Sequence, residues 1–239
     1  FPATLSPLPI LDPGEGLKNA QSGVPGDTAG KRMALLRGMD EAFSGRVKDD
    51  GVKAYDEFYQ NTLKLMKGKD LAAFDLEKEP AELRGRYGDN RFGQGCLLAR
   101  RLVEGGVRYV EVESGGWDMH KDIEGGMEDR GAEFDRAFAA LVSDLDARGL
   151  LDSVMVVVAT EFGRKPQFDG SGRGHHPLVF SSVVAGGGVK RGFVYGSSDN
   201  RGGEVASNAV GVGDLHAAIG FACGLPIDKE VLSPSGRPF

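Results

Sequence analysis

The sequence predicts an α/β fold built on a largely parallel β-sheet. Two observations carry this prediction. From residue 90 onward, strand-like and helix-like segments alternate along the chain, as they do in α/β proteins. The run SVMVVVAT at 153–160 is short, apolar and β-branched, which is typical of a strand buried on both faces. The composition, 40% hydrophobic and 27% charged over 239 residues, is that of a globular chain and excludes collagen, a coiled coil and disorder.

The first third of the chain is predicted to be extended and then helical. Residues 1–30 hold five of the eleven prolines and indicate an extended Pro/Gly-rich arm. Apolar residues recur at helical spacing over 31–48 and 52–67, which predicts two amphipathic helices forming a hairpin. A short helix at 70–78 completes a hairpin segment spanning 31–80.

Residues 81–239 are predicted to form the α/β domain, packed with the rest as one structural unit. The expected helices span 90–104, 128–148 and 214–223, and the expected strands span 107–112, 153–160 and 178–185.

The net charge, the hydropathy and the cysteine content limit the partners and the chemistry that can be expected. The net charge is −6 and the sequence has no dense basic patch, so no nucleic-acid partner is expected. No stretch approaches the roughly 20 apolar residues of a membrane helix, so no transmembrane segment is expected. Cys96 and Cys223 lie in apolar helical patterns that favour two buried thiols, and a disulfide between them stays open. Cys96 has no nearby histidine, which argues against a cysteine nucleophile.

Three loops at predicted strand ends carry the residues suited to chemistry. They are GGWDMH at 115–120, TEFGR at 160–164 and GRGHHP at 172–177, and they hold three of the four histidines. Ligands of open parallel sheets bind beyond the carboxyl ends of strands, so these loops form the predicted site. The Gly-rich segment AGGGVKRG lacks the spacing of a phosphate-binding P-loop.

The residue types in these loops suit a divalent metal. Asp118 and His120 are two apart, so an extended backbone directs both side chains to one side. A carboxylate and an imidazole together favour Zn, Mn or Fe. Glu161 is a candidate for another ligand, and His175 or His176 for the closing one.

Each of these features also has a plain structural explanation. An Asp-x-His pair is a weak motif, adjacent surface histidines are usually solvated, and Glu161 has Arg164 nearby as an ion-pair partner. His216, in an apolar helical segment, favours a structural role. The coincidence of polar residues at three strand ends is what favours a site.

The order of these motifs resembles that of domain-of-unknown-function family 1501, described as sulfatase-like and grouped with the alkaline phosphatase-like superfamily. The resemblance rests on YGDNRFGQGCLLARRLVEGGVRYVEV, GGWDMH, DLDARGLLDS, VVVATEFGR, GRGHHP, AGGGVKRGFVYGSSD and DLHAAIGFACGLP, which cover about 70–239 in the family's order. It implies a three-layer α/β/α sandwich similar to alkaline phosphatases. The chain would be its C-terminal portion, incomplete at the N-terminus.

The resemblance also implies a function. It implies a metal-dependent hydrolase acting on a small anionic phosphate or sulfate ester, in a periplasmic or secreted setting. A divalent metal, zinc or else manganese or calcium, would be bound by Asp118, His120, Glu161 and His175 or His176. Arg164 or Arg173 would hold the anionic group of the substrate.

The chain departs from this family at several positions. Phe162 stands where the superfamily has a second metal-binding histidine, Gly174 replaces an aspartate, and Lys165 replaces a threonine. No nucleophile is visible in residues 1–70. These departures support two alternatives, a non-catalytic member or fragment that keeps the fold for binding or assembly, and a single-metal structural or binding site. We expect the 239-residue chain alone to fold without full activity, and its oligomeric state stays open.

Overall fold

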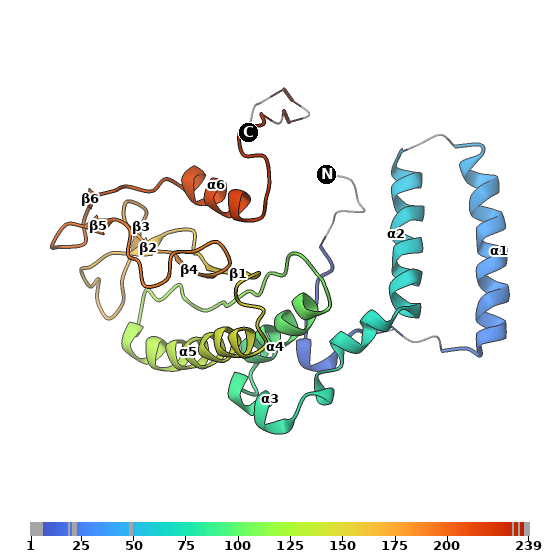
Figure 1. Ribbon diagram of the computed structural model, residues 1–239, viewed down its shortest axis with the longest axis horizontal. Coiled ribbons are helices and arrows are strands. Elements are labelled where there is room, and N and C mark those ends of the chain that lie inside the picture. Colours follow the sequence, from blue (N-terminus) through green and yellow to red (C-terminus); the bar gives the residue numbers. More distant parts are fainter. Residues whose placement is uncertain are drawn as a thin grey trace. The chain divides into compact units, whose positions relative to one another are not determined.

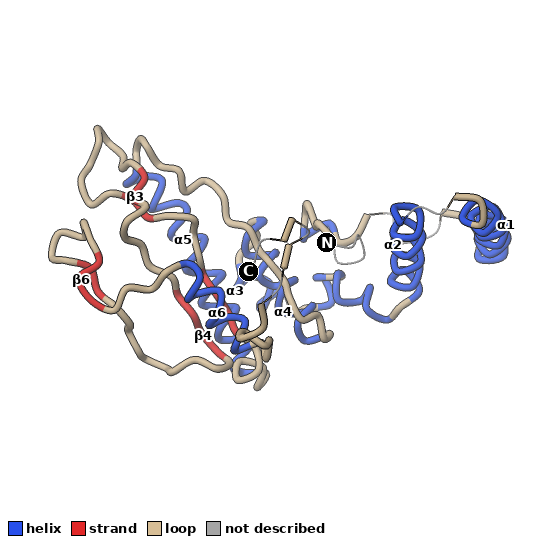
Figure 2. Tube along the Cα trace, turned by 90° about the horizontal axis from the view of Figure 1, so that it is seen from above, coloured by secondary structure: helices blue, strands red, loops and turns tan. Residues whose placement is uncertain are grey.

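Helices dominate the chain, and its strands are short (Figures 1 and 2). The computed structural model describes residues 7–18, 20, 23–47, 50–230, 232–233 and 235–236. The chain divides into two units, Phe1–Val112 and Glu113–Phe239. The segment boundaries predicted near residues 30 and 80 stay a prediction.

The first unit is helical. Its elements are η2 (Pro13–Glu15), α1 (Gly26–Ser44), α2 (Asp50–Lys67), η3 (Lys69–Phe74), η4 (Leu76–Lys78), α3 (Ala81–Tyr87) and α4 (Arg91–Glu104). The predicted helices at 31–48 and 52–67 are confirmed as α1 and α2, which contact each other where the Tyr59 hydroxyl lies 3.6 Å from the Met33 sulfur. The helix expected at 70–78 is instead the two 3-10 turns η3 and η4.

Helix α4 organises the core of the first unit. The Asn90 side chain caps it by accepting a hydrogen bond from the Gly93 amide at 2.8 Å. The helix contacts η2, η3, η4 and α3. It buries the apolar residues Cys96, Leu97, Leu98 and Ala99.

Arginine 100 is buried on the same helix, with a fully covered side chain. It pairs with Glu79 at 2.9 Å and with Glu104 at 2.8 Å. A guanidinium this deep is tolerated because carboxylates lie directly against it.

The second unit combines two helices with three strand pairs. Its elements are α5 (Ile123–Ala147), β1 (Met155–Val158), β2 (Gly163–Arg164), β3 (His175–His176), β4 (Val183–Gly186), β5 (Ser197–Ser198), β6 (Val205–Ser207) and α6 (Val212–Ala222). Helix α5 confirms the helix predicted at 128–148, beginning five residues earlier, and it buries Ala137, Ala140 and Leu145 along one stripe.

The predicted parallel α/β/α sandwich, alkaline phosphatase-like in its layers, is wrong. In the part of the chain that the structure describes, the β-structure consists of two-stranded antiparallel pairs: β1 with β4, β2 with β3, and β5 with β6. Strand β1 pairs with β4 in the register Met155↔Gly186 to Val158↔Val183. A parallel pair needs a crossover, usually a helix, but the connection between β1 and β4 holds the β2–β3 hairpin instead.

Two further expectations about strands also change. The alternating segment 107–112 forms no strand, and the Tyr109 side chain there is exposed. A strand requires a hydrogen-bonded neighbour, which alternation alone does not supply. The predicted strand at 178–185 shortens to β4 at Val183–Gly186.

Helix α6 confirms the helix predicted at 214–223 but has no buried residue among those described. None of the helices described in either unit combines the length and apolar character that a membrane span requires.

Candidate metal site

The loop that carries Asp118 and His120 is fixed by the residues between and beside them. Trp117 packs edge-on against Phe134 of α5, with ring centroids 6.0 Å apart, and its indole N–H donates to the Ser114 hydroxyl at 2.9 Å. Met119 is buried, whereas Asp118 and His120 on either side of it are exposed. The predicted alternation is therefore present: the thioether faces inward, and the two polar side chains face outward together.

The second part of the site is the β2–β3 hairpin. Arg164 pairs with His175 across this hairpin, and Gly163 pairs with His176. Because neighbouring residues of a strand face opposite sides, the two adjacent histidines separate. His175 faces the Asp118 loop, and buried His176 has its Nε2 atom 3.0 Å from the Gly202 carbonyl oxygen.

Backbone hydrogen bonds join the loop to the hairpin. The Arg173 amide donates to the Met119 carbonyl at 3.1 Å, and the Ile123 amide donates to the Ser171 carbonyl at 3.0 Å. The Ser171 hydroxyl also accepts from the Asp122 amide at 3.0 Å, at the start of α5. Two segments about 50 residues apart in sequence are thus held backbone to backbone.

Three potential ligand atoms converge where these segments meet. The Nε2 atoms of His120 and His175 lie 3.1 Å apart. The Asp118 Oδ1 atom lies 3.1 Å from the first and 2.9 Å from the second. These three residues form the one group of three or more potential ligands found among the described residues. We call them the Asp–His–His cluster.

The spacing and chemistry of this cluster fit a first-row divalent cation. Ligands about 2.0 Å from a tetrahedral zinc ion lie about 3.3 Å from one another, close to the distances within the cluster. Two imidazole nitrogens with one carboxylate oxygen favour zinc, with manganese as a weaker choice, and disfavour calcium, which takes oxygen ligands.

A guanidinium lies on the carboxylate of the cluster. Arg164 Nη2 donates a short hydrogen bond to Asp118 Oδ1, and its Nη1 donates to the Arg173 carbonyl at 3.1 Å. The hydrogen bonds from Arg164 and from His175 lower the pKa of Asp118 to about 2. The carboxylate is therefore charged at neutral pH.

Aromatic rings flank both the histidine and the second arginine. The Phe162 ring lies 4.2 Å from the His175 ring, between centroids, at an angle of 31°. The Arg173 guanidinium lies over the Phe168 ring, 4.6 Å from its centroid. Within the cluster, the His175 imidazole thus has an aromatic neighbour.

The other predicted site residues lie outside the cluster. Glu161 is exposed and is not among the three clustered residues, and His176 holds the loop around Gly202. His216, for which the sequence favours a structural role and which was not a candidate ligand, is exposed on α6. The structure therefore brings together Asp118, His120, His175 and Arg164, with Arg173 beside them through its backbone.

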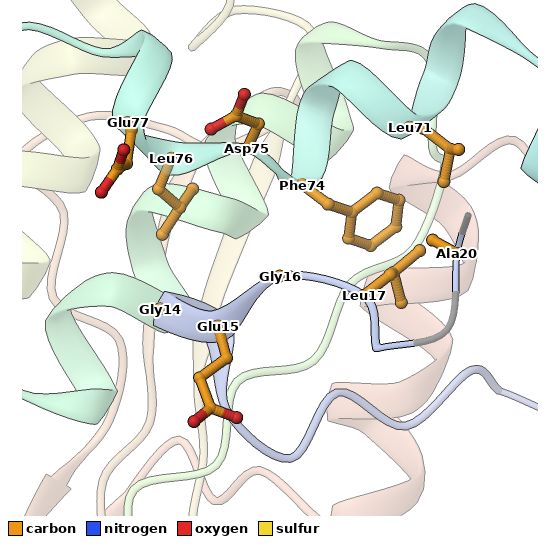
Figure 3. A pocket seen from close by; sticks show the side chains of 10 residues that line it. All are labelled: Gly14, Glu15, Gly16, Leu17, Ala20, Leu71, Phe74, Asp75, Leu76 and Glu77. Atoms are coloured by element: carbon orange, nitrogen blue, oxygen red, sulfur yellow. The ribbon is translucent and has the colours of Figure 1, made fainter. Parts of the chain in front are cut away.

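A cavity of about 540 Å³ lies elsewhere, within the first unit (Figure 3). It is lined by residues around η2, η3 and η4: Gly14, Glu15, Gly16, Leu17, Ala20, Leu71, Phe74, Asp75, Leu76 and Glu77. Among the described residues, this lining includes no histidine, lysine or arginine and carries three carboxylates, so it lacks the positive charge expected for an anionic ester.

Sequence reasoning did not find the residues that support the cluster. Trp117, Met119, Ser171 and Gly172 position its loops through packing and backbone contacts. The density of glycine in GGWDMH and GSGRG was the available signal, because glycine is needed where two backbones approach closely.

Comparison with known proteins identifies the family to which the chain belongs. The chain belongs to a protein family of unknown function, DUF1501, whose model matches residues 1–239. No curated protein and no solved structure matches it.

Proposed function

We propose that this protein is a metal-dependent hydrolase-like domain that acts on phosphate or sulfate esters. The observation that carries the proposal is the convergence of Asp118 Oδ1 and the two histidine Nε2 atoms, all within 4.8 Å of one another. Three ligands from two separate segments, held by backbone hydrogen bonds, are an arrangement suited to a resident cation.

In this proposal the Asp–His–His cluster holds a divalent cation, zinc being the best fit to its ligands. Such an ion, when bound, polarises an ester oxygen and stabilises negative charge that develops on it. The two imidazoles bind through neutral Nε2 atoms, and the Asp118 carboxylate supplies a negative charge that Arg164 keeps in place.

The arginines would receive the anionic group of the substrate. The Arg173 guanidinium is held over Phe168, and its buried Nε atom has no hydrogen-bond partner among the described residues. Arg164 adds a second positive charge beside the cluster. Both favour an anionic ester over a neutral one.

Zinc titration of the purified chain, followed by a panel of phosphate and sulfate esters, tests the proposal. Wild-type protein should bind zinc, and His120→Ala and His175→Ala should each weaken that binding by at least about tenfold. His216→Ala, which removes the exposed histidine of α6, is the matched control and should leave zinc affinity unchanged. A chain that binds no zinc, or whose ester hydrolysis survives both cluster variants, contradicts the proposal.

A non-catalytic role is the second candidate, and one observation favours it. All three cluster side chains are exposed, 68% for Asp118, 51% for His120 and 45% for His175. A bound ion would then clamp the two loops for binding or assembly. Zinc binding without turnover of any ester in the panel would favour this role.

The proposal includes a periplasmic or secreted location, which is what the family resemblance implies. Cell fractionation of the natural host with an antibody against the chain would test it.

A further inference from the structure

We infer that the Asp–His–His cluster takes one divalent cation, and that the Arg164 guanidinium supplies the second positive charge facing the substrate's oxyanion. This inference rests on the proposed function and narrows it. It defines a mononuclear site assisted by an arginine, for an ester with a tetrahedral oxyanion group such as phosphate or sulfate.

The number of metal ligands in the cluster is enough for a single cation. One oxygen, Asp118 Oδ1, faces both histidine Nε2 atoms, so the three ligand atoms surround a single position. The two remaining candidates do not add a second set. Glu161 lies outside the group, and the Nε2 atom of His176 is 3.0 Å from the Gly202 carbonyl. No second group of three ligands occurs among the described residues.

The guanidinium of Arg164 holds a fixed positive charge beside the cluster. Its guanidinium touches the same carboxylate oxygen that faces the histidines, and it is held there from the other side by the Arg173 carbonyl. The pairing of Arg164 with His175 across the β2–β3 hairpin keeps both side chains at this end of the sheet. An arginine stays charged at every physiological pH, so Arg164 supplies a permanent positive charge beside Asp118 that needs no second ion.

The Phe162 ring lies against the cluster and offers no metal ligand. It covers one face of the His175 imidazole at 4.2 Å, and the Arg164 guanidinium lies 6.0 Å from the same ring. That flank of the cluster offers carbon in place of a ligand atom. The polar groups at the cluster are therefore the three ligand atoms and the planar Arg164 guanidinium.

These features select the substrate class. A tetrahedral oxyanion can present one oxygen to the cation and another to the N–H groups of an arginine. A neutral carboxylic ester lacks that second anionic oxygen. The site should therefore select substrates by the negative charge of the ester group, and not by the length of their alkyl or aryl part.

The test measures zinc stoichiometry and then the binding of inorganic phosphate to the zinc-loaded chain. Wild-type protein should hold one zinc ion per chain by elemental analysis. Arg164→Gln should keep that stoichiometry and weaken phosphate binding by at least about tenfold, because a charged hydrogen-bond donor is lost. Arg164→Lys, which keeps the charge, should recover part of the affinity.

Arg191, which lies in the second unit like Arg164, provides a matched control for the substitution of Arg164. Arg191 also donates to an exposed carboxylate, Asp152, at 2.6 Å, and its side chain is exposed. Arg191→Gln should change neither zinc stoichiometry nor phosphate affinity.

The possible results distinguish a failure of this inference from a failure of the proposed function. Two zinc ions per chain, or an Arg164→Gln variant that binds phosphate like the wild type, would overturn this inference and leave the proposed function standing. A chain that binds no zinc would overturn both. Circular dichroism of each variant shows that a lost affinity does not come from unfolding.

Discussion

Gly172 lies directly against the backbone of His120. A Cβ atom at position 172 would lie 2.1 Å from the carbonyl carbon of His120 and 2.2 Å from its oxygen. Gly172→Ala must therefore push the hairpin away from the Asp118 loop and separate His175 from His120. We expect zinc affinity to fall by at least about tenfold, with a loss of stability of about 1–3 kcal/mol from the forced backbone shift.

Gly174, two residues along the same hairpin, provides the control for this substitution. A Cβ atom there meets only the side chain of Lys165, at 3.7 Å, which is ordinary van der Waals contact. Gly174→Ala should bind zinc like the wild type in the same titration. Equal zinc affinity in the two variants would show that the close approach at Gly172 does not set the geometry of the cluster.

The adjacent histidines should respond to substitution in opposite ways. His176 is buried and lies within hydrogen-bond distance of the Gly202 carbonyl, so His176→Ala leaves a hole and a carbonyl without its partner. We expect it to destabilise the fold by about 1–3 kcal/mol while zinc affinity stays within about threefold. Exposed His175 should show the reverse: loss of zinc affinity with an unchanged melting temperature of the zinc-free protein.

Thermal unfolding without zinc and zinc titration, run on both variants, check this crossed pattern. If the two substitutions gave the same pair of changes, the division of roles between His175 and His176 would be incorrect.

The two cysteines should differ in reactivity. Cys96 lies in the core of the first unit, and burial raises the pKa of its thiol to about 12. Cys223, at the end of α6, is exposed. Since the thiolate is the reactive form, an aromatic disulfide reagent at pH 8 should label one thiol per native chain and two after denaturation. Cys223→Ser should abolish the labelling of the native chain; if Cys96→Ser does so instead, the assignment is wrong.

These thiols also show how far the sequence could predict the fold. The apolar pattern around Cys96 has the period of a helix whose one face is covered, and α4 confirms it. The same kind of pattern around Cys223 gives α6, whose residues are not buried, because a period identifies a helix but not what packs on it.

The error in the sheet has a related cause. The run around Val156 forms a strand as predicted, although it spans only Met155–Val158 and is half-buried instead of buried on both faces. An apolar strand carries no information about the direction of its neighbour. The direction depends on the connection, and residues 161–176 form a hairpin with no helical period. The presence of Pro166 and several glycines in that connection was the sign against a crossover helix.

At the candidate site, the spacing of residues close together in the sequence predicted where their side chains lie. Contacts between residues far apart in the sequence could not be predicted in this way. The i, i+2 relation of Asp118 and His120 predicted a common side, and their side chains do lie together, with Asp118 Oδ1 3.1 Å from His120 Nε2. Choosing His175 over His176 required knowing which face of β3 is covered, and that depends on the loop around Gly202, some 26 residues away.

Glu79 should make the stability of the first unit depend on pH. Burial alone would raise the pKa of this carboxyl, but hydrogen bonds and charges from Arg100 and Arg101 outweigh that effect and lower it below the ordinary value of 4.5. A carboxyl whose pKa is lower in the folded state stabilises the fold fully above that ordinary value, and this contribution is lost as the pH falls below it. Wild-type protein should therefore lose unfolding free energy on acidification from about pH 6 to about pH 3.

Substituting this carboxylate separates its contribution from that of the other acidic groups. Glu79→Gln leaves the buried Arg100 guanidinium without one of its carboxylate partners and should cost about 3–5 kcal/mol at pH 7. The variant should also lose less stability on acidification than the wild type, because its side chain no longer titrates. Glu77→Gln, on the exposed side of η4, is the control and should leave both quantities unchanged. Urea unfolding at several pH values measures them; an equal pH dependence in wild type and Glu79→Gln would show that the ion pairs on α4 do not govern acid stability.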